Sequence, residues 1–146
     1  KVITSLADEF PGHPYFAFLK GELMAKTESW EELNKFLPQS EKFARNGPLL
    51  QQNECQLKLA YIKGIKAFKT GDFEESIKQS TWLLENYHME FDWLKGFAHF
   101  LRGQCHEQNG DFGLAILDFE EVLKIDSYYL EVEEARERIQ EIRDRR

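Results

Sequence analysis

LRGQCHEQNGDFGLAILDFEEVLKID, residues 101–126, describes two helices joined by a tight turn. Residues 101–108 indicate the end of one helix. In Asn109-Gly110-Asp111 the glycine can take the left-handed C-terminal cap, and the aspartate can cap the next helix. The following residues predict an amphipathic helix over 112–125, whose apolar stripe comprises Ile116, Phe119, Val122 and Leu123. The stretch therefore predicts a helical hairpin.

Small residues set the expected spacing between these two helices. Gly103 on the first helix and Ala115 on the second have almost no side chain, so the backbones can approach closely and Phe119 can lie against the first helix. A bulky residue at Gly103 should separate the two helices. The polar face of the second helix is expected to stay in water and comprises Asp118, Glu120, Glu121 and Lys124.

This hairpin resembles a tetratricopeptide repeat, whose pattern of about 34 residues runs Trp-x2-Leu-Gly-x2-Tyr, then Ala-x3-Phe, then Pro. Gly103, Ala115 and Phe119 match that pattern. The chain departs from it at the Trp, Leu, Tyr and Pro places, which are held by His99, Arg102, His106 and Ser127.

The same pattern occurs twice more in the chain. AFLKGELMAKTESWEELN around Gly21 and AYIKGIKAFKTGDFEESI around Gly64 align with HFLRGQCHEQNGDFGLAI around Gly103. A cation precedes each glycine (Lys20, Lys63, Arg102), and an aromatic residue follows it nine positions later (Trp30, Phe73, Phe112). The glycines are 43 and 39 residues apart, so we expect longer first helices and insertions in the connections.

The predicted fold is all-α: a right-handed α-α superhelix of about three such hairpins closed by a C-terminal capping helix. The expected segments are 1–13, the remnant of a preceding repeat's second helix, then repeats over 14–56, 57–95 and 96–129, and a solvating helix over 130–146. Pro38 predicts a kink or restart within the first repeat, because proline removes a helical hydrogen bond.

Composition excludes several functional classes. The chain has no apolar run long enough to span a membrane. A net charge of −7 and the lack of a basic stripe argue against nucleic-acid binding. Cys55 and Cys105 are expected to be free thiols, since the repeat alignment places them at different heights on neighbouring helices. The compartment stays open between the cytoplasm and a bacterial envelope.

No motif predicts an enzyme, a cofactor or a metal. His99, Cys105, His106 and Glu107 are the nearest approach to a metal-ligand cluster, but the two histidines are seven positions apart and lack the spacing of a zinc hydrolase. Each histidine is expected to replace a large packing residue and to find a local hydrogen bond. The turn glycines have no following Lys-Ser/Thr, so no phosphate loop is present. The chain is therefore predicted to be non-enzymatic.

The resemblance assigns ligand binding to the concave surface, which in this family is lined by the first helix of each repeat. It implies a peptide-binding or amphipathic-helix-binding face comprising Tyr15, Phe18, Glu22, Tyr61, Ile65, Phe68, Phe97, Phe100 and Gln104. The family's carboxylate clamp for chaperone tails is lacking, because its places are held by residues that cannot bind a carboxylate. The expected function is a protein-protein interaction module with a protein or peptide partner.

An alternative assigns these aromatic residues to the core. The chain would then be a structural segment of a longer repeat array, from which it has been cut. Its N-terminal end would expose Val2, Ile3 and Leu6, and would stack on upstream repeats or associate with a second copy.

Overall fold

The computed structural model describes residues 14–46, 49–87, 92–124 and 130–145. These residues form seven helices and no strand, so the predicted all-α fold is confirmed. In chain order they are α2 (Pro14–Lys26), α3 (Trp30–Asn46), α4 (Leu49–Lys69), α5 (Phe73–Glu85), α6 (Asp92–Gln108), α7 (Phe112–Leu123) and α8 (Leu130–Asp144). The expected remnant over 1–13, with Val2, Ile3 and Leu6, lies outside the described residues.

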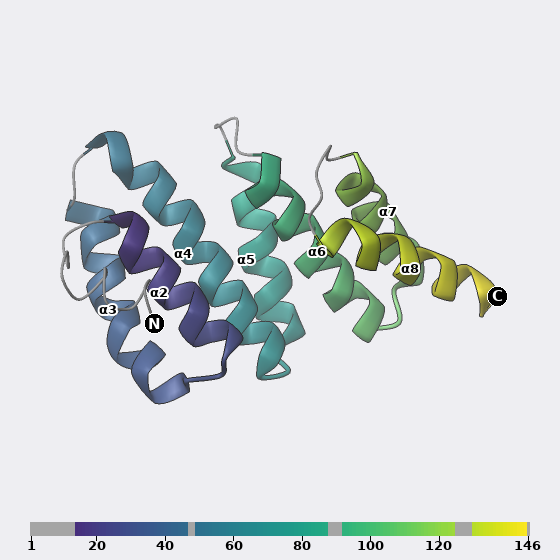
Figure 1. The fold of residues 1–146 in the computed structure, drawn as a ribbon, viewed down its shortest axis with the longest axis horizontal. Coiled ribbons are helices and arrows are strands. Elements are labelled where there is room, and N and C mark those ends of the chain that lie inside the picture. The colour runs from purple at the N-terminus through teal and green to yellow at the C-terminus, as the bar shows by residue number, and fades with distance from the viewer. Residues whose placement is uncertain (1–13, 47–48, 88–91, 125–129, 146) are drawn as a thin grey trace.

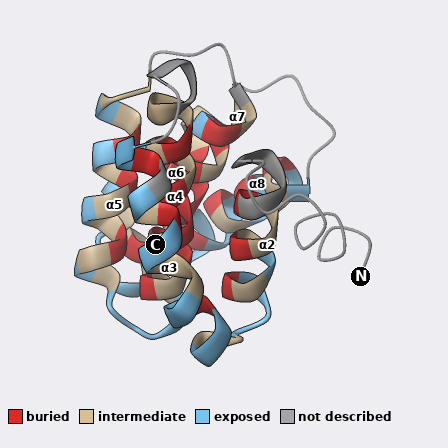
Figure 2. Cartoon of the chain, turned by 90° about the vertical axis from the view of Figure 1, so that its left-hand side faces the viewer, coloured by how far each residue is buried: buried red, intermediate tan, exposed pale blue. Residues whose placement is uncertain are grey.

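The helices pack in neighbouring pairs that follow one another along the long axis of the molecule (Figure 1). Three hairpins are formed by α2 with α3, α4 with α5, and α6 with α7. The second helix of each hairpin also packs on the next helix of the chain, so α3 contacts α4, α5 contacts α6, and α7 contacts α8. Helices α2 and α8 lie on the same side of the layer formed by α4 and α6 (Figures 1 and 2).

The turns inside the second and third hairpins need glycine. Gly71 and Gly110 have φ angles of 84° and 80°, a region that side chains rarely adopt. The N–H of the next residue closes each helix end: Asp72 donates to Ala67 O at 2.8 Å, and Asp111 donates to His106 O at 2.8 Å. Asp72 also caps α5 by accepting from the Glu75 N–H, whereas the Asp111 side chain makes no such bond.

The three aligned glycines occupy matching positions, each facing the second helix of its own hairpin. A Cβ atom added at Gly21 would lie 2.5 Å from Phe36 Cε1 on α3, and one at Gly103 would lie 2.8 Å from Phe119 Cε1 on α7. At Gly64 it would lie 3.7 Å from Gln79 on α5 and 2.9 Å from a methyl group of α6. A larger residue would therefore crowd the paired helix at Gly21 and Gly103, and helix α6 at Gly64.

The buried side chains form two clusters, and their concentration between the helices is visible in Figure 2. The larger cluster, which we call the main core, joins α2, α3, α4, α5 and α6. The smaller one, the C-terminal core, comprises Phe100, Ala115, Phe119, Val122, Val132, Ala135, Ile139 and Ile142. Helix α6 serves both: Ala98 and Leu101 belong to the main core, while Phe100 points into the C-terminal core.

Two features of the helix bounds bear on the sequence predictions. Helix α3 runs through Pro38 without a break, because the buried positions Leu33, Ser40 and Ala44 keep one face packed on both sides of the exposed proline. The expected repeat boundaries after residues 56 and 95 fall inside α4 and α6, since both helices begin earlier than the repeat pattern does.

Cys55 and Cys105 are both free and fully buried. Burial raises the pKa of each thiol to about 11. Over the described ranges, no helix combines the length and the apolar character that crossing a membrane requires.

Candidate functional site

The first helices of the three hairpins enclose a hollow of ≈ 520 Å³, which we call the central groove. Helices α2, α4 and α6 all contribute to it, as expected for the concave side of such an array. Its lining comprises Phe18, Leu19, Glu22, Glu54, Lys58, Tyr61, Ile62, Trp93, Leu94 and Phe97.

Aromatic rings in contact with one another form one side of the central groove. Phe97 stacks on Tyr61 with ring centroids 6.1 Å apart, and Trp93 meets Phe97 edge-on at 5.6 Å. The ammonium group of Lys26 lies 6.0 Å from the centroid of the Phe97 ring, a cation–π geometry. Trp93 and Phe97 are half-buried and pack against the main core.

Charged pairs lie at the edge of the groove on two helices. Lys26 pairs with Glu22 at 2.9 Å on α2, and Lys58 pairs with Glu54 at 2.9 Å on α4. Burial raises the pKa of the Tyr61 hydroxyl, and the negative charges of Glu22 and Glu131 raise it further. The negative charge of Glu131 on α8 therefore adds to that of Glu22 at this tyrosine.

The structure divides the residues that sequence analysis assigned to the concave face. Phe18, Glu22, Tyr61 and Phe97 line the central groove, and of these Phe18 and Tyr61 are also buried in the main core. Phe68 and Gln104 are half-buried, Ile65 is buried in the main core, and the Tyr15 side chain lies outside the described residues.

Phe100 is the clearest departure from that assignment. Its side chain is only 8% exposed, and its ring lies 5.7 Å from the Phe119 ring. It packs in the C-terminal core, which includes Val132, Ala135 and Ile139 of α8. The contacts of Phe100 therefore agree with the alternative that assigns the aromatic residues to the core.

Several groove residues escaped the sequence prediction. Trp93 and Leu94 begin α6, earlier than the repeat pattern starts, so they had no counterpart in it. A helical-face argument could have found Trp93, because it precedes Phe97 by four positions and so shares its face.

Asp118 was expected in water, and that prediction was wrong. Asp118 is 4% exposed, and both of its carboxylate oxygens accept hydrogen bonds from Arg102. The Arg102 Nη2 donates to Oδ1 at 2.8 Å, and Nε donates to Oδ2 at 2.9 Å. His99 Nδ1 lies 2.8 Å from Oδ1, and Arg102 also reaches Thr81 Oγ1 on α5 at 3.2 Å. Burial alone would raise the pKa of Asp118, but the hydrogen bonds from His99 and Arg102 lower it.

The contacts of Asp118 join neighbouring helices and do not have the arrangement of a metal site. His106 Nε2 lies 3.7 Å from Asp118 Oδ2, so two histidines flank one carboxylate. The Arg102 guanidinium occupies both oxygens that a metal ion would need. Across the described residues, no group of three metal-ligating side chains is arranged to hold an ion. The cluster ties α5, α6 and α7 together through paired charges.

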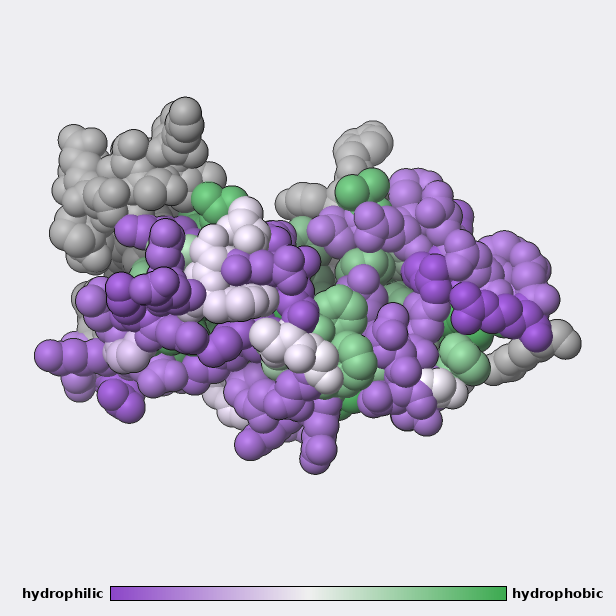
Figure 3. All heavy atoms as spheres, turned by 90° about the horizontal axis from the view of Figure 1, so that it is seen from below, coloured by the Kyte–Doolittle hydropathy of each residue, from purple (hydrophilic) through white to green (hydrophobic). Residues whose placement is uncertain are grey.

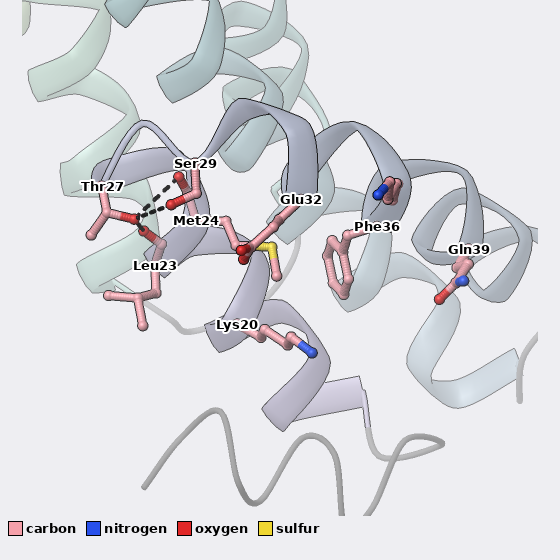
Figure 4. Close-up of a pocket in the computed structure, with 9 residues that line it drawn as sticks. Lys20, Leu23, Met24, Thr27, Ser29, Glu32, Phe36 and Gln39 are labelled. Atoms are coloured by element: carbon pink, nitrogen blue, oxygen red, sulfur yellow. Dashed lines mark hydrogen bonds between the residues drawn. The ribbon is translucent and has the colours of Figure 1, made fainter. Parts of the chain in front are cut away.

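A second hollow of ≈ 480 Å³ lies between α2 and α3, at the N-terminal end of the described array (Figure 4). Met24 and Phe36 lie beside it, with Lys20 on the α2 side. Leu23, which also lines it, is 40% exposed. We call this region the end hollow.

Polar groups dominate one face of the molecule. Viewed from below, the molecule is mostly hydrophilic, with small hydrophobic patches near its middle and towards the C-terminal end (Figure 3). Among the described residues, the large apolar side chains with the greatest exposure are Leu114, Leu117 and Leu130.

Comparison with known proteins identifies the third hairpin. Residues 96–129 match the family described as tetratricopeptide repeat, over the same range that sequence analysis assigned to the third repeat. The chain matches no curated protein and no solved structure. Repeats of this kind generally act as non-catalytic modules that bind protein partners or serve as scaffolds. The third hairpin is therefore assigned to the tetratricopeptide repeat family, and it stands in an all-helical stack of hairpins consistent with that fold.

Proposed function

We propose that the central groove binds a segment of a protein partner, in the form of a peptide or an amphipathic helix. The observation that carries this proposal is the hollow of ≈ 520 Å³ lined by rings and aliphatic side chains from three successive first helices. A hollow with an apolar lining and charged groups at its edge is the usual form of a recognition site.

The half-buried rings are the proposed anchoring points. Trp93 and Phe97 already contact each other and Tyr61, so a partner side chain entering the groove would meet a preorganised aromatic surface. Phe18 and Glu22 bound the site on α2. Phe68 and Gln104 would extend the same face along α4 and α6.

The proposal is tested with a random peptide library displayed on phage and selected on the whole protein. Selected peptides are synthesised and titrated against wild type, Phe97→Ala and the milder Phe97→Leu. Because aromatic residues at the centre of interfaces contribute about 2 kcal/mol or more, Phe97→Ala should weaken binding by roughly 30-fold. Phe112→Ala is the matched control, since Phe112 is also half-buried but packs against the C-terminal core.

Circular dichroism on each variant separates loss of binding from loss of folding. The proposal is refuted if selection yields no peptide whose affinity depends on Phe97, or if Phe112→Ala weakens binding as much as Phe97→Ala while both variants stay folded.

A second candidate function is self-association through the end hollow. It is favoured by the exposure of Leu23, which is 40% exposed and lines this hollow with Met24 and Phe36. An apolar side chain of a second copy could pack against these residues.

Sedimentation velocity over a range of protein concentrations tests this second candidate. Self-association through the end hollow predicts a sedimentation coefficient that rises with concentration and that Leu23→Arg returns to the monomer value. Leu117→Arg, on the opposite end of the array, is the control. A monomer at every concentration would exclude this candidate.

A further inference from the structure

Three carboxylates on α8 have no cationic partner among the described residues: Glu131, Glu134 and Glu137. The neighbouring acids of the same helix are paired, since Glu133 binds Arg136 at 2.6 Å and Glu141 binds Arg138. Burial raises the pKa of Glu134, and the charges of Glu131 and Glu137 raise it further. These side chains therefore repel one another without a compensating positive charge.

The helix that carries these carboxylates packs against α6, whose first turns line the central groove. Helix α8 is on the same side of the α4–α6 layer as α2 (Figures 1 and 2). Glu131 is close enough to raise the pKa of the groove residue Tyr61, and Glu134 follows it by one helical turn. Helices α2 and α8 thus stand on the two sides of a surface whose floor is α4 and α6.

The positively charged side chains near the groove already pair with carboxylates. Lys26 and Lys58 pair with Glu22 and Glu54 at the edge of the groove. On α8, Arg138 binds Glu107 of α6 through two nitrogen atoms. Four carboxylates lie in or near the groove, Glu22, Glu54, Glu131 and Glu134, whereas only two lysines, Lys26 and Lys58, lie there among the described residues. The surface is therefore negative, with the same sign as the net charge of −7.

We propose that the central groove is selective for a basic amphipathic segment, whose apolar side chains enter the hollow and whose lysines or arginines lie against Glu131 and Glu134. This inference rests on the proposed function, because it needs a ligand in the groove. The apolar contacts supply most of the affinity, while the charges steer the approach and fix the orientation of the segment.

The charge pattern of the phage-selected peptides is the first readout. Groove-dependent peptides should be enriched in lysine and arginine beside their apolar positions, relative to the unselected library. The second readout is the affinity of one such peptide for Glu131→Gln/Glu134→Gln, compared with Glu31→Gln/Glu74→Gln. The control pair makes the same change in net charge at exposed positions on α3 and α5.

Removal of the two α8 carboxylates should weaken binding about five- to tenfold and reduce its dependence on salt. The control pair should change affinity less than twofold. If Phe97-dependent peptides are neutral or acidic, or if the α8 variant keeps wild-type affinity, the charge selectivity is wrong while the groove function stands. If no selected peptide has an affinity that depends on Phe97, both the proposed function and the charge selectivity are refuted.

Discussion

Truncating Phe100 separates the core interpretation from the groove interpretation more sharply than any other single change. The ring is 8% exposed, and an aromatic side chain removes at least about 150 Å² from water. At about 25 cal/mol per Å² this burial amounts to ~4 kcal/mol, within the range of about 3–5 kcal/mol measured when buried aromatic residues become alanine. Loss of the contact with Phe119 acts in the same direction. We expect Phe100→Ala to lower the free energy of unfolding by ~4 kcal/mol.

Urea denaturation followed by far-ultraviolet circular dichroism measures this loss. Leu117→Ala is the control, because Leu117 is 61% exposed on the neighbouring helix, and it should change stability by no more than about 0.5 kcal/mol. A loss from Phe100→Ala as small as that of the control would refute the packing described for the C-terminal core. If the Phe100→Ala protein is as stable as wild type but binds groove peptides more weakly, Phe100 contacts the ligand, as sequence analysis expected.

Three further outcomes are expected. Gly103→Val should destabilise the third hairpin far more than Gly113→Val in thermal melts, because an added Cβ meets the Phe119 ring at the first site and open space at the second. Asp118→Asn should lower the free energy of unfolding at neutral pH and make it depend less on pH in the acid range. Because the pKa of Asp118 is lowered by folding, the ionised carboxylate stabilises the fold above its unfolded pKa of about 3.9. This stabilisation is lost as the pH falls through the folded pKa. Native Cys55 and Cys105 should react with an alkylating reagent only as fast as the chain opens, because both thiols are buried and have raised pKa values; rapid native labelling would contradict this.

The helices were largely predictable because their ends carry local signals. The hairpin predicted over 101–126 is formed by α6 and α7, and Gly71 and Gly110 mark turns that need a positive φ angle. Periodicity and turn chemistry act over a few neighbouring residues, so a single sequence contains them. The first hairpin has no such glycine: Glu28 takes a φ of 57° in its turn.

The candidate site was less predictable because it depends on contacts between distant helices. Asp118 follows the charge pattern of an exposed face, and the hydrogen bonds from His99 and Arg102 of α6 offset the cost of burying its charge. Phe100 sits on the expected concave stripe, but α8 packs over it. The position of a capping helix across an array is not encoded in the repeat pattern itself.

The division of the interior into two cores bears on how the chain comes apart. Because contacts in stacked arrays run mainly between neighbours, the packing around Phe119 and Ile139 can loosen while α2 to α5 stay closed. Amide protons of α8 would then exchange with solvent through smaller fluctuations than those of α4. Limited proteolysis would attack the chain first beyond α6, leaving the groove-bearing part as the resistant fragment.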